Sequence, residues 1–264
     1  MPQWYVENKV VVVTGGSKGI GEGLVGVLLD RGAKVAVLAR DNARLQASVA
    51  QWQSDRVVGF PVDVSDRDAL DEVYCKIWEH FGQIDAVINN VGFQFPRRVE
   101  LMPAQEVRQL VELNLLSTIF GCQAAIPWLR RNGGGRIVNI SSATVRCDNE
   151  FAHLAVYTAC KAAVDQFTAE LRKELVEDNI LVTLFSSGSV FTGTVNNFDE
   201  NALAEAYTAW LAKGEYYGGS TTPPIMGAAI AQSLEYPPGI AAEFIEVKPG
   251  VRTSKRLEGQ EDGA

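Results

Sequence analysis

Hydrophobic residues along this chain alternate between short, β-branched runs and longer stretches with helical spacing. The short runs predict strands at 9–15, 34–40, 56–64, 84–90, 135–142, 180–187 and, at a sheet edge, 243–249. The helical pattern predicts helices at 20–33, 41–53, 66–81 and 154–178, and one long helix or two in series at 103–131. Aspartates at positions 41 and 66 are suited to cap the second and third of these helices.

Alternation of strands and helices, with strands apolar on both sides, is typical of α/β proteins. We therefore expect a doubly wound parallel sheet of about seven strands with helices on both faces. Residues 1–250 are predicted to form a single domain. Within it, 188–223 is rich in Gly, Thr, Asn and aromatic residues, and we expect it to pass over the carboxyl edge of the sheet as a lid. The polar tail 251–264 is expected to fray.

Composition and charge narrow the classes of partner. Of the 264 residues, 47% are apolar and 21% charged, as in ordinary globular domains. The net charge of −8 disfavours nucleic acid and anionic lipid as partners. The first residues, MPQWYVENK, lack the apolar core of a signal peptide, and no apolar run approaches the ~20 residues that span a bilayer. We expect a cytoplasmic protein with a small-molecule partner and no membrane.

The cysteines and histidines argue against a metal site. Cys75, Cys122, Cys147 and Cys160 form no CxxC pair, and the chain has only two histidines. We expect reduced, buried thiols, which suit a reducing compartment. His80 ends a predicted helix, where a cation complements the helix dipole, so we assign it no catalytic role.

A glycine-rich segment follows the first predicted strand and opens the first predicted helix. In TGGSKGIG, the residues Gly15, Gly19 and Gly21 permit a tight turn and let backbone N–H groups approach a pyrophosphate. The spacing is GxxxGxG, and the alternative is an ordinary glycine-rich turn. Because the order strand, glycine loop, helix is that of a dinucleotide site, we predict dinucleotide binding. The loop side chains expected at the cofactor are Ser17, Lys18 and Ile20.

The residues after the second strand bear on which dinucleotide binds. An NAD site usually has Asp or Glu at this point, whereas this chain has Ala39 followed by Arg40. A guanidinium suits the 2′-phosphate of NADP(H), and Lys18 supplies a second cation that could reach the same group. The alternative is two solvated surface cations. We predict NADP(H) as cofactor.

A phenol and an amine lie four residues apart in YTACK. On a helix, Tyr157 and Lys161 share one face. A free tyrosine has a pKa of ~10, and a nearby ammonium is expected to lower it toward a value useful for general acid/base catalysis. The alternative is an exposed helix face. Two further polar residues favour chemistry: Ser142 closes the fifth strand, and Asn114 lies in an apolar helix, where its alternative role is a satisfied core hydrogen bond.

Ordered short motifs carry a resemblance to a known family. They are TGGSKGIG, DV at 63–64, NNVG at 89–92, NLLS at 114–117, NISS at 139–142 and YTACK. Over roughly residues 8–250 the chain resembles the short-chain dehydrogenase/reductase family, which has a Rossmann-type fold. The resemblance implies an oxidoreductase that interconverts a ketone or aldehyde and a secondary alcohol, as a homodimer or homotetramer through the helices at 103–131 and 154–178.

The same resemblance implies roles for individual residues. Tyr157 would be the general acid/base, and Lys161 would hold the nicotinamide ribose and tune the phenol. Ser142 would polarise the substrate carbonyl, and Asn114 would support a water-linked proton relay. The remaining cofactor residues would be Asp63 and Val64 beside the adenine, Asn90 and Gly92 along the cofactor, and Gly188, Val190 and Thr192 after the sixth strand.

Three departures from the family pattern concern substrate and cofactor seating. The gap between Ser142 and Tyr157 is two residues longer than usual. Ser187 stands where the family commonly has proline, and EVKPG replaces a DGG ending. The alternative functions are a cofactor-binding sensor or scaffold without turnover, and an epimerase or dehydratase on the same fold.

Aromatic residues in the loops near the reaction centre predict an apolar substrate pocket. For His153, a structural role competes with substrate contact, and ordinary lid packing is the alternative for each aromatic. The predicted pocket residues are Phe93, Phe95, Phe151, His153 and Phe191, with Phe198, Tyr207, Trp210, Tyr216 and Tyr217 elsewhere in the lid.

Overall fold

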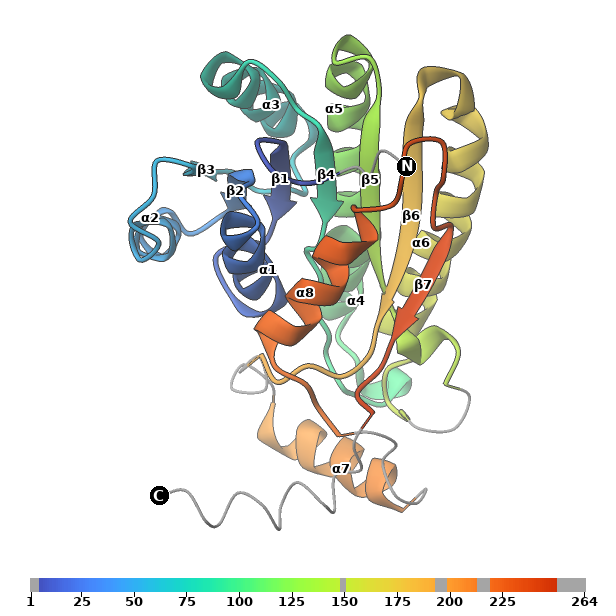
Figure 1. Cartoon of the computed structure of the whole chain (residues 1–264). Coiled ribbons are helices and arrows are strands. Elements are labelled where there is room, and N and C mark those ends of the chain that lie inside the picture. Colours follow the sequence, from blue (N-terminus) through green and yellow to red (C-terminus); the bar gives the residue numbers. More distant parts are fainter. Residues whose placement is uncertain (1–4, 148–150, 193–198, 213–218, 251–264) are drawn as a thin grey trace.

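One parallel sheet forms the centre of the molecule. The computed structural model describes residues 5–147, 151–192, 199–212 and 219–250. The strand order is β3-β2-β1-β4-β5-β6-β7, and each neighbouring pair is parallel. The strands are β1 (Val10–Thr14), β2 (Lys34–Ala39), β3 (Val57–Pro61), β4 (Ala86–Asn89), β5 (Gly135–Ser142), β6 (Ile180–Ser187) and β7 (Phe244–Val247). The predicted fold and edge strand are confirmed (Figure 1).

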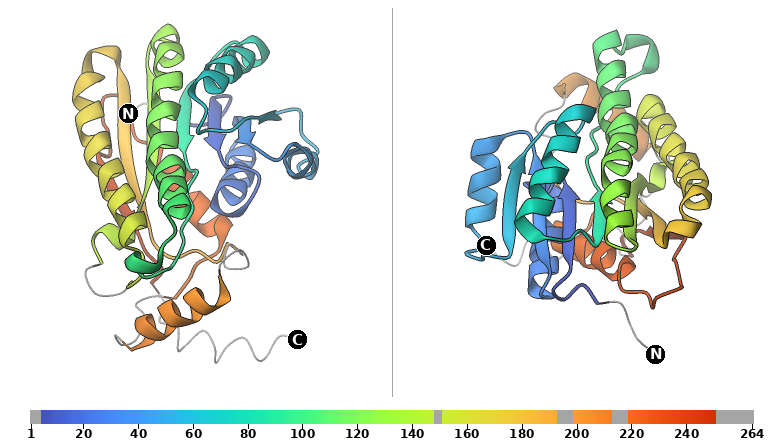
Figure 2. Two further views of the ribbon diagram at one scale, coloured as in Figure 1. Left: turned by 180° about the vertical axis from the view of Figure 1, so that it is seen from behind. Right: turned by 90° about the horizontal axis from the view of Figure 1, so that it is seen from above.

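Helices cover both faces of the sheet. Figure 2 shows α1 and α8 on one side and α3, α5 and α6 on the other. Each face has its own cluster of buried side chains. The helices are α1 (Gly19–Asp30), α2 (Asn42–Ala50), α3 (Arg67–Phe81), α4 (Ala104–Val111), α5 (Ser117–Arg131), α6 (Ala155–Glu174), α7 (Glu200–Leu211) and α8 (Pro223–Ser233), with short turns η1 (Val99–Leu101), η3 (Ala143–Val145) and η4 (Val176–Asp178).

Local sequence signals fix several helix ends. The Asp41 carboxylate accepts a hydrogen bond from the backbone N of Arg44 at 3.1 Å, and Asp66 accepts one from the backbone N of Ala69 at 3.0 Å. Both predicted N-caps are therefore confirmed, and each is worth about 1 kcal/mol of helix stability.

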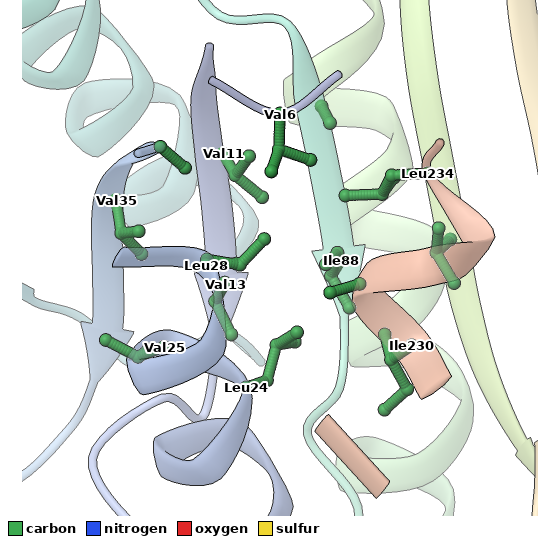
Figure 3. Close-up of a cluster of buried hydrophobic side chains, with 14 of the residues drawn as sticks. Val6, Val11, Val13, Leu24, Val25, Leu28, Val35, Ile88, Ile230 and Leu234 are labelled. Carbon is green, nitrogen blue, oxygen red and sulfur yellow. The ribbon is translucent and has the colours of Figure 1, made fainter. Parts of the chain in front are cut away.

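Helix α8 was absent from the sequence prediction, which assigned no element between the lid and β7. Its apolar residues are distributed around the helix, so no amphipathic period marks it. Ile230 and Leu234 lie in the same buried cluster as Leu24 and Leu28 of α1 (Figure 3). The two helices approach closely at Gly227, where an added Cβ would lie 2.6 Å from the backbone N of Leu24. Helix α8 thus supports the helix behind the glycine loop.

The stretch predicted as one helix or two in series is a continuous helical segment, Ala104–Arg131. A π-helical turn, η2 (Glu112–Leu116), joins α4 to α5. The expectation of no sufficiently long apolar segment was wrong, because these 28 residues could cross a membrane by length and composition. Half of the most apolar window is buried inside the protein, which is the behaviour of a core helix, so the signal for a membrane span is weak.

Part of the predicted lid is described, and it lies beyond the carboxyl ends of the strands. Figure 1 shows α7 at that edge. The indole N–H of Trp210 donates to the carbonyl of Ala152 at 2.7 Å, and Asp199 lies 3.6 Å from the Arg97 guanidinium. These contacts hold α7 over the segments before α6 and after β4. Phe198, Tyr216, Tyr217 and the tail 251–264 lie outside the described residues.

The cysteines differ in exposure, so the expectation that all four thiols are buried was wrong. Cys122 and Cys160 are buried, Cys147 is half-buried and Cys75 is exposed. Cys75 lies on the solvent side of α3, where no packing requires an apolar side chain. Burial raises the pKa of Cys122 to about 12, against the opposing effect of its hydrogen bonds with Asn139 and Asn89.

Candidate active site

The side chains of Ser142 and Tyr157 lie near each other where β5 ends and α6 begins. Ser142 is the last residue of β5, is 7% exposed, and lies near enough to Tyr157, in the first turn of α6, for its side chain to act on the pKa of that phenol. The Ser142 hydroxyl also accepts from the Thr144 hydroxyl at 3.0 Å and from the Thr144 backbone N at 3.3 Å. The structure therefore brings together the serine and tyrosine singled out from the sequence.

Lys161 lies one turn after Tyr157 and is buried. Its ammonium nitrogen donates to the Ile140 carbonyl at 2.9 Å, which fixes the side chain against the end of β5. Burial lowers the pKa of Lys161 to about 8, while the charges of Cys160 and Asp165 act to raise it. A Cβ added at Gly92 would lie 3.3 Å from this nitrogen, so the loop after β4 passes directly over the lysine.

The pKa of Tyr157 departs from its usual value in the direction opposite to the expected one. Burial raises this pKa, and the nearby Ser142 side chain opposes the rise only in part. The predicted net lowering of this pKa was therefore wrong, because burial outweighs the groups that favour the phenolate. Near neutral pH the phenol is protonated, which suits a proton donor.

Asn114 lies at the centre of the π-helical turn and is fully buried. Its side-chain oxygen accepts from the Phe93 backbone N at 3.0 Å, and its amide donates to the carbonyls of Phe93 at 2.8 Å and Leu110 at 2.9 Å. Both amide hydrogens are used, and one lone pair of the oxygen is left for water. The satisfied hydrogen bonds of the alternative interpretation are present. They anchor the loop after β4, and π-turns are frequent at functional sites.

The glycine loop has the geometry of an anion cradle. Gly15 and Gly19 adopt left-handed backbone conformations with φ of +67° and +53°. Lys18 is the N-cap residue of α1, with no side-chain cap, so the first-turn N–H groups remain available to a ligand. Ser17 is buried, and Ile20 packs against the core beneath the loop. These observations fit a bound pyrophosphate.

The third predicted glycine of the loop, Gly21, is required by close packing. It is buried in the first turn of α1, where an added Cβ would collide with the Gly15 carbonyl and lie 2.7 Å from the side-chain nitrogen of Asn90. That nitrogen donates to the Thr14 carbonyl at 2.9 Å. The absence of a side chain at Gly21 therefore lets the start of α1 approach both the turn after β1 and the end of β4. This packing supports the shape of the loop, while Gly15 and Gly19 supply its turn.

The segment after β6 completes the walls around this loop. A Cβ added at Gly19 would lie 3.3 Å from the side chain of Thr192, so this segment reaches the glycine loop. Val190 forms an isolated bridge with Thr221. The structure thus brings the predicted cofactor residues after β4 and β6 to the same edge as the loop.

A cavity of about 320 Å³ lies beside the end of β2. The Arg40 guanidinium lies 3.7 Å from the Asp63 carboxylate, and both side chains are substantially exposed. Burial acts to raise the pKa of Asp63, but hydrogen bonds from Ser65 and the charge of Arg40 hold it below its usual value. Val64 is buried next to Asp63. The cavity is lined by Arg40, Asp63, Ser65, Gln105, Arg108, Gln109, Glu112 and Leu113.

The helix α4 side of this cavity was missed by the sequence analysis. Arg108 lies on it, giving a second cation beside Arg40, whereas Lys18 is exposed at the start of α1. The signal available in the sequence was the helical spacing of Gln105, Arg108 and Glu112, which puts polar residues on one face of α4 and its continuation, the first residue of η2.

The departure at position 187 is accommodated within the sheet. Ser187 pairs with Ser142 in the register of β5 and β6, and its hydroxyl donates to the Gly188 carbonyl at 3.0 Å. A Cβ at Gly188 would lie 2.9 Å from the Cα of Lys248, so this turn packs against the end of β7. Serine therefore satisfies its hydroxyl locally where the family commonly has proline.

The predicted pocket residues fall into separate groups. Phe93 and Phe95 make an edge-to-face contact with ring centroids 4.7 Å apart, and Phe151 makes a similar contact with Trp210 at 5.6 Å. The backbone carbonyl of His153 accepts from the backbone N of Arg97 at 2.9 Å, whereas the buried ring Nδ1 has no hydrogen-bond partner among the described residues. Phe191 is 71% exposed and does not contribute a buried wall. One aromatic pair therefore lies in the segment after β4, and the other joins the segment before α6 to α7.

Metal-binding chemistry has no candidate in the part of the chain that the structure describes. Within those ranges, no group of three or more His, Cys, Asp or Glu side chains is close enough to hold an ion. The site is instead built from hydroxyls, an amine, an amide and backbone groups.

Comparisons with known proteins agree with this arrangement. The family model described as short chain dehydrogenase matches residues 9–203. An uncharacterized oxidoreductase of Staphylococcus aureus (strain USA300) is 30% identical over 242 residues, covering 92% of this chain and 97% of the relative. One from Staphylococcus saprophyticus is 30% identical over 246 residues, with the same coverage. The crystal structure of gox2181 has a TM-score of 0.80 and 24% identity, covering 92% of this chain and 95% of that chain, a likeness of fold.

Proposed function

The chain belongs to the short-chain dehydrogenase family, and from that premise we propose an NADP(H)-dependent oxidoreductase that interconverts a ketone or aldehyde and a secondary alcohol. The family uses nicotinamide cofactors, and the relatives reported above are named oxidoreductases. One observation carries the proposal: the side chains of Ser142, Tyr157 and buried Lys161 lie together where β5 ends against α6, at the sheet edge that carries the glycine loop.

Substrate binding would use the two adjoining hydroxyls. A carbonyl oxygen placed between Ser142 and Tyr157 can accept a hydrogen bond from each, and both donors are preorganised by contacts within the protein. As negative charge develops on that oxygen, these hydrogen bonds strengthen. The serine polarises the carbonyl, and the tyrosine is in position to transfer its proton.

Proton transfer follows from the protonation states of the two residues on α6. Burial raises the pKa of Tyr157, so the phenol carries its proton near neutral pH and can give it to the forming alkoxide. The Tyr157 phenolate that results is stabilised by the Lys161 ammonium, one helical turn away. In alcohol oxidation the phenolate takes the proton back. The remaining lone pair on the Asn114 oxygen can hold a water molecule for exchange with solvent.

Cofactor binding would rest on the loop geometry and on charges near β2. The left-handed glycines and the uncapped start of α1 fit a pyrophosphate. Arg40 and Arg108 fit the 2′-phosphate of NADP(H). Gly92, which leaves room over Lys161, fits a ribose at that point. A nicotinamide bound there supplies or accepts the hydride.

The experiment is a panel of ketones and alcohols with NADPH and NADH, followed by the absorbance of the reduced nicotinamide. We expect turnover of aromatic or alicyclic ketones with NADPH. Tyr157→Phe should abolish turnover while leaving NADPH binding, measured by fluorescence, within about twofold, because only the proton donor is removed. Turnover confined to small polar ketones would contradict the apolar pocket, and NADPH binding without turnover of any ketone would favour the sensor alternative.

Cofactor preference is tested with a matched pair of arginines. Arg40→Ala should raise the KM for NADPH by about 10-fold to 100-fold, because a charge-assisted hydrogen bond contributes ~1.5–3 kcal/mol. The KM for NADH should stay within about twofold. Arg44→Ala, which removes the same charge from the exposed face of α2, is the control. Equal effects of Arg40→Ala on both cofactors would contradict 2′-phosphate recognition.

A further inference from the structure

The end of β5 is bonded to α6 at two successive strand positions, and the next position faces Tyr157. The Ile140 carbonyl accepts from Lys161, and the Ser141 hydroxyl donates to the Asp165 carboxylate. Ser142 follows them and acts on the Tyr157 phenol. Tyr157, Lys161 and Asp165 are spaced by four residues, so they follow one face of the helix. Asp165 therefore continues the row that contains the proposed acid and its lysine.

The second oxygen of Asp165 extends this connection past Ser142. It accepts a hydrogen bond from the Arg146 guanidinium at 2.6 Å. Arg146 immediately follows η3, and its guanidinium also lies over the ring of Phe244 at 4.1 Å from the centroid. Asp165 thus bonds residue 141, just before Ser142, and residue 146, at the far end of the turn that follows it.

The bonds of Asp165 to Ser141 and Arg146 fix the turn η3, whose Thr144 orients the Ser142 hydroxyl. Thr144, in the middle of η3, donates to the Ser142 hydroxyl from both its side chain and its backbone. A displacement of η3 would therefore move the Ser142 hydroxyl relative to Tyr157. Misplacement of a reacting group by about 1 Å can lower a rate by about 100-fold.

Asp165 also acts on Lys161 through charge. Its side chain is only 14% exposed, so solvent screens its field weakly. The carboxylate favours the ammonium form of Lys161 and opposes the effect of burial. Arg146 partly neutralises that carboxylate. The titratable groups that act on the lysine are Cys160 and Asp165, both on α6, and Arg146 after η3 is linked to it through Asp165.

We propose that Asp165 is a positioning residue for the reaction, which holds the Ser142 turn in register with α6 and supplies the counter-charge of the Lys161 ammonium. The assignment rests on the proposed function. Asp165 reaches the chemistry through Ser141, Arg146 and Lys161, without touching the reacting atoms.

The test compares pH profiles of ketone reduction with NADPH, using the aromatic or alicyclic ketone with the highest turnover. Asp165→Asn should lower kcat by about 10-fold or more and change the KM for NADPH by less than about twofold. It should also move the alkaline limb of kcat to lower pH, because Lys161 loses its counter-charge. Asp165→Glu should return the limb toward the wild-type position. Asp178→Asn, which breaks an exposed ion pair with Arg130, is the matched control.

Arg146→Gln supplies an independent reading if Asp165→Asn fails to fold. Removing the guanidinium leaves the Asp165 charge less neutralised, so the alkaline limb should move to higher pH, opposite to Asp165→Asn. If the alkaline limb of the kcat profile is unchanged in both variants, or moves in the same direction in both, Asp165 is not the positioning residue. The proposed function still stands in that case, because the wild-type enzyme turns over the ketone. Absence of carbonyl turnover in the wild-type enzyme would overturn the proposed function and the assignment together.

Discussion

Replacing Asn114 by alanine separates its structural contribution from any part in proton transfer. The side chain is fully buried and makes three hydrogen bonds, two to the backbone of Phe93 and one to the carbonyl of Leu110. All three are lost in Asn114→Ala. The Phe93 N–H and C=O then lose their side-chain partner at the start of the loop that covers Lys161.

The expected loss of stability follows from the number of bonds. Each hydrogen bond contributes a net ~1 kcal/mol, so three correspond to about 3 kcal/mol. For a chain of this size 1 kcal/mol lowers Tm by about 2 °C, which predicts a decrease of about 6 °C. Asn114→Asp should be no better, because its second oxygen would face the carbonyls of Phe93 and Leu110 instead of donating to them.

Thermal unfolding followed by circular dichroism measures the effect, with Asn201→Ala on the exposed face of α7 as the control. The control should stay within about 1 °C of the wild type, because surface substitutions change stability by about 0.5 kcal/mol or less. A Tm for Asn114→Ala equal to that of the control would refute the structural reasoning. So would a Tm for Asn114→Asp close to the wild type, since it would mean that occupied volume, and not hydrogen bonding, is what matters at this position.

Two further predictions concern pH and packing. The kcat of ketone reduction should be constant through neutral pH and decline above pH about 8. The pKa of Lys161 lies there, and its ammonium stabilises the phenolate left on Tyr157. A kcat that rises from pH 7 to 9 in buffers of constant ionic strength would contradict this prediction. Gly121→Ala should lower the free energy of unfolding by about 1–3 kcal/mol, measured by urea denaturation, because the new Cβ would collide with the buried Asn89 side chain. Gly250→Ala, where a Cβ meets open space, is the control. Equal urea midpoints of unfolding for the two variants would contradict the prediction, because they would mean that α5 moves away from Asn89 at no cost.

The fold was predictable where one local signal decided the structure. Continuous apolar runs such as Val10–Thr14 become strands buried on both faces, and glycines at the first turn mark the loop before α1. Helix α8 was missed because the side that is not buried also carries apolar residues, such as Ile225 and Ala228, and so no polar face reveals its period. Its opening prolines, Pro223 and Pro224, were the usable signal, since proline is favoured in the first turn of a helix.

The site was predictable in its membership and less so in its electrostatics. The spacing of Tyr157 and Lys161 placed both on one helix face beside Ser142, as the structure has them. Spacing says nothing about how much water surrounds a group, and burial is what raises the pKa of Tyr157. The contact of Asp165 with Ser141 joins residues 24 positions apart, so only the packing of β5 on α6 reveals it.

The packing of α8 on α1 has a consequence for how the protein is made. An added Cβ at Gly23 would meet the backbone of Pro223, so the helix behind the glycine loop is completed by a segment some two hundred residues later in the chain. During synthesis the amino-terminal half leaves the ribosome long before that segment exists. The apolar side of α1 that faces α8 then stays uncovered until that later segment has been synthesised. The packing behind the glycine loop is therefore completed only after some two hundred further residues have been made.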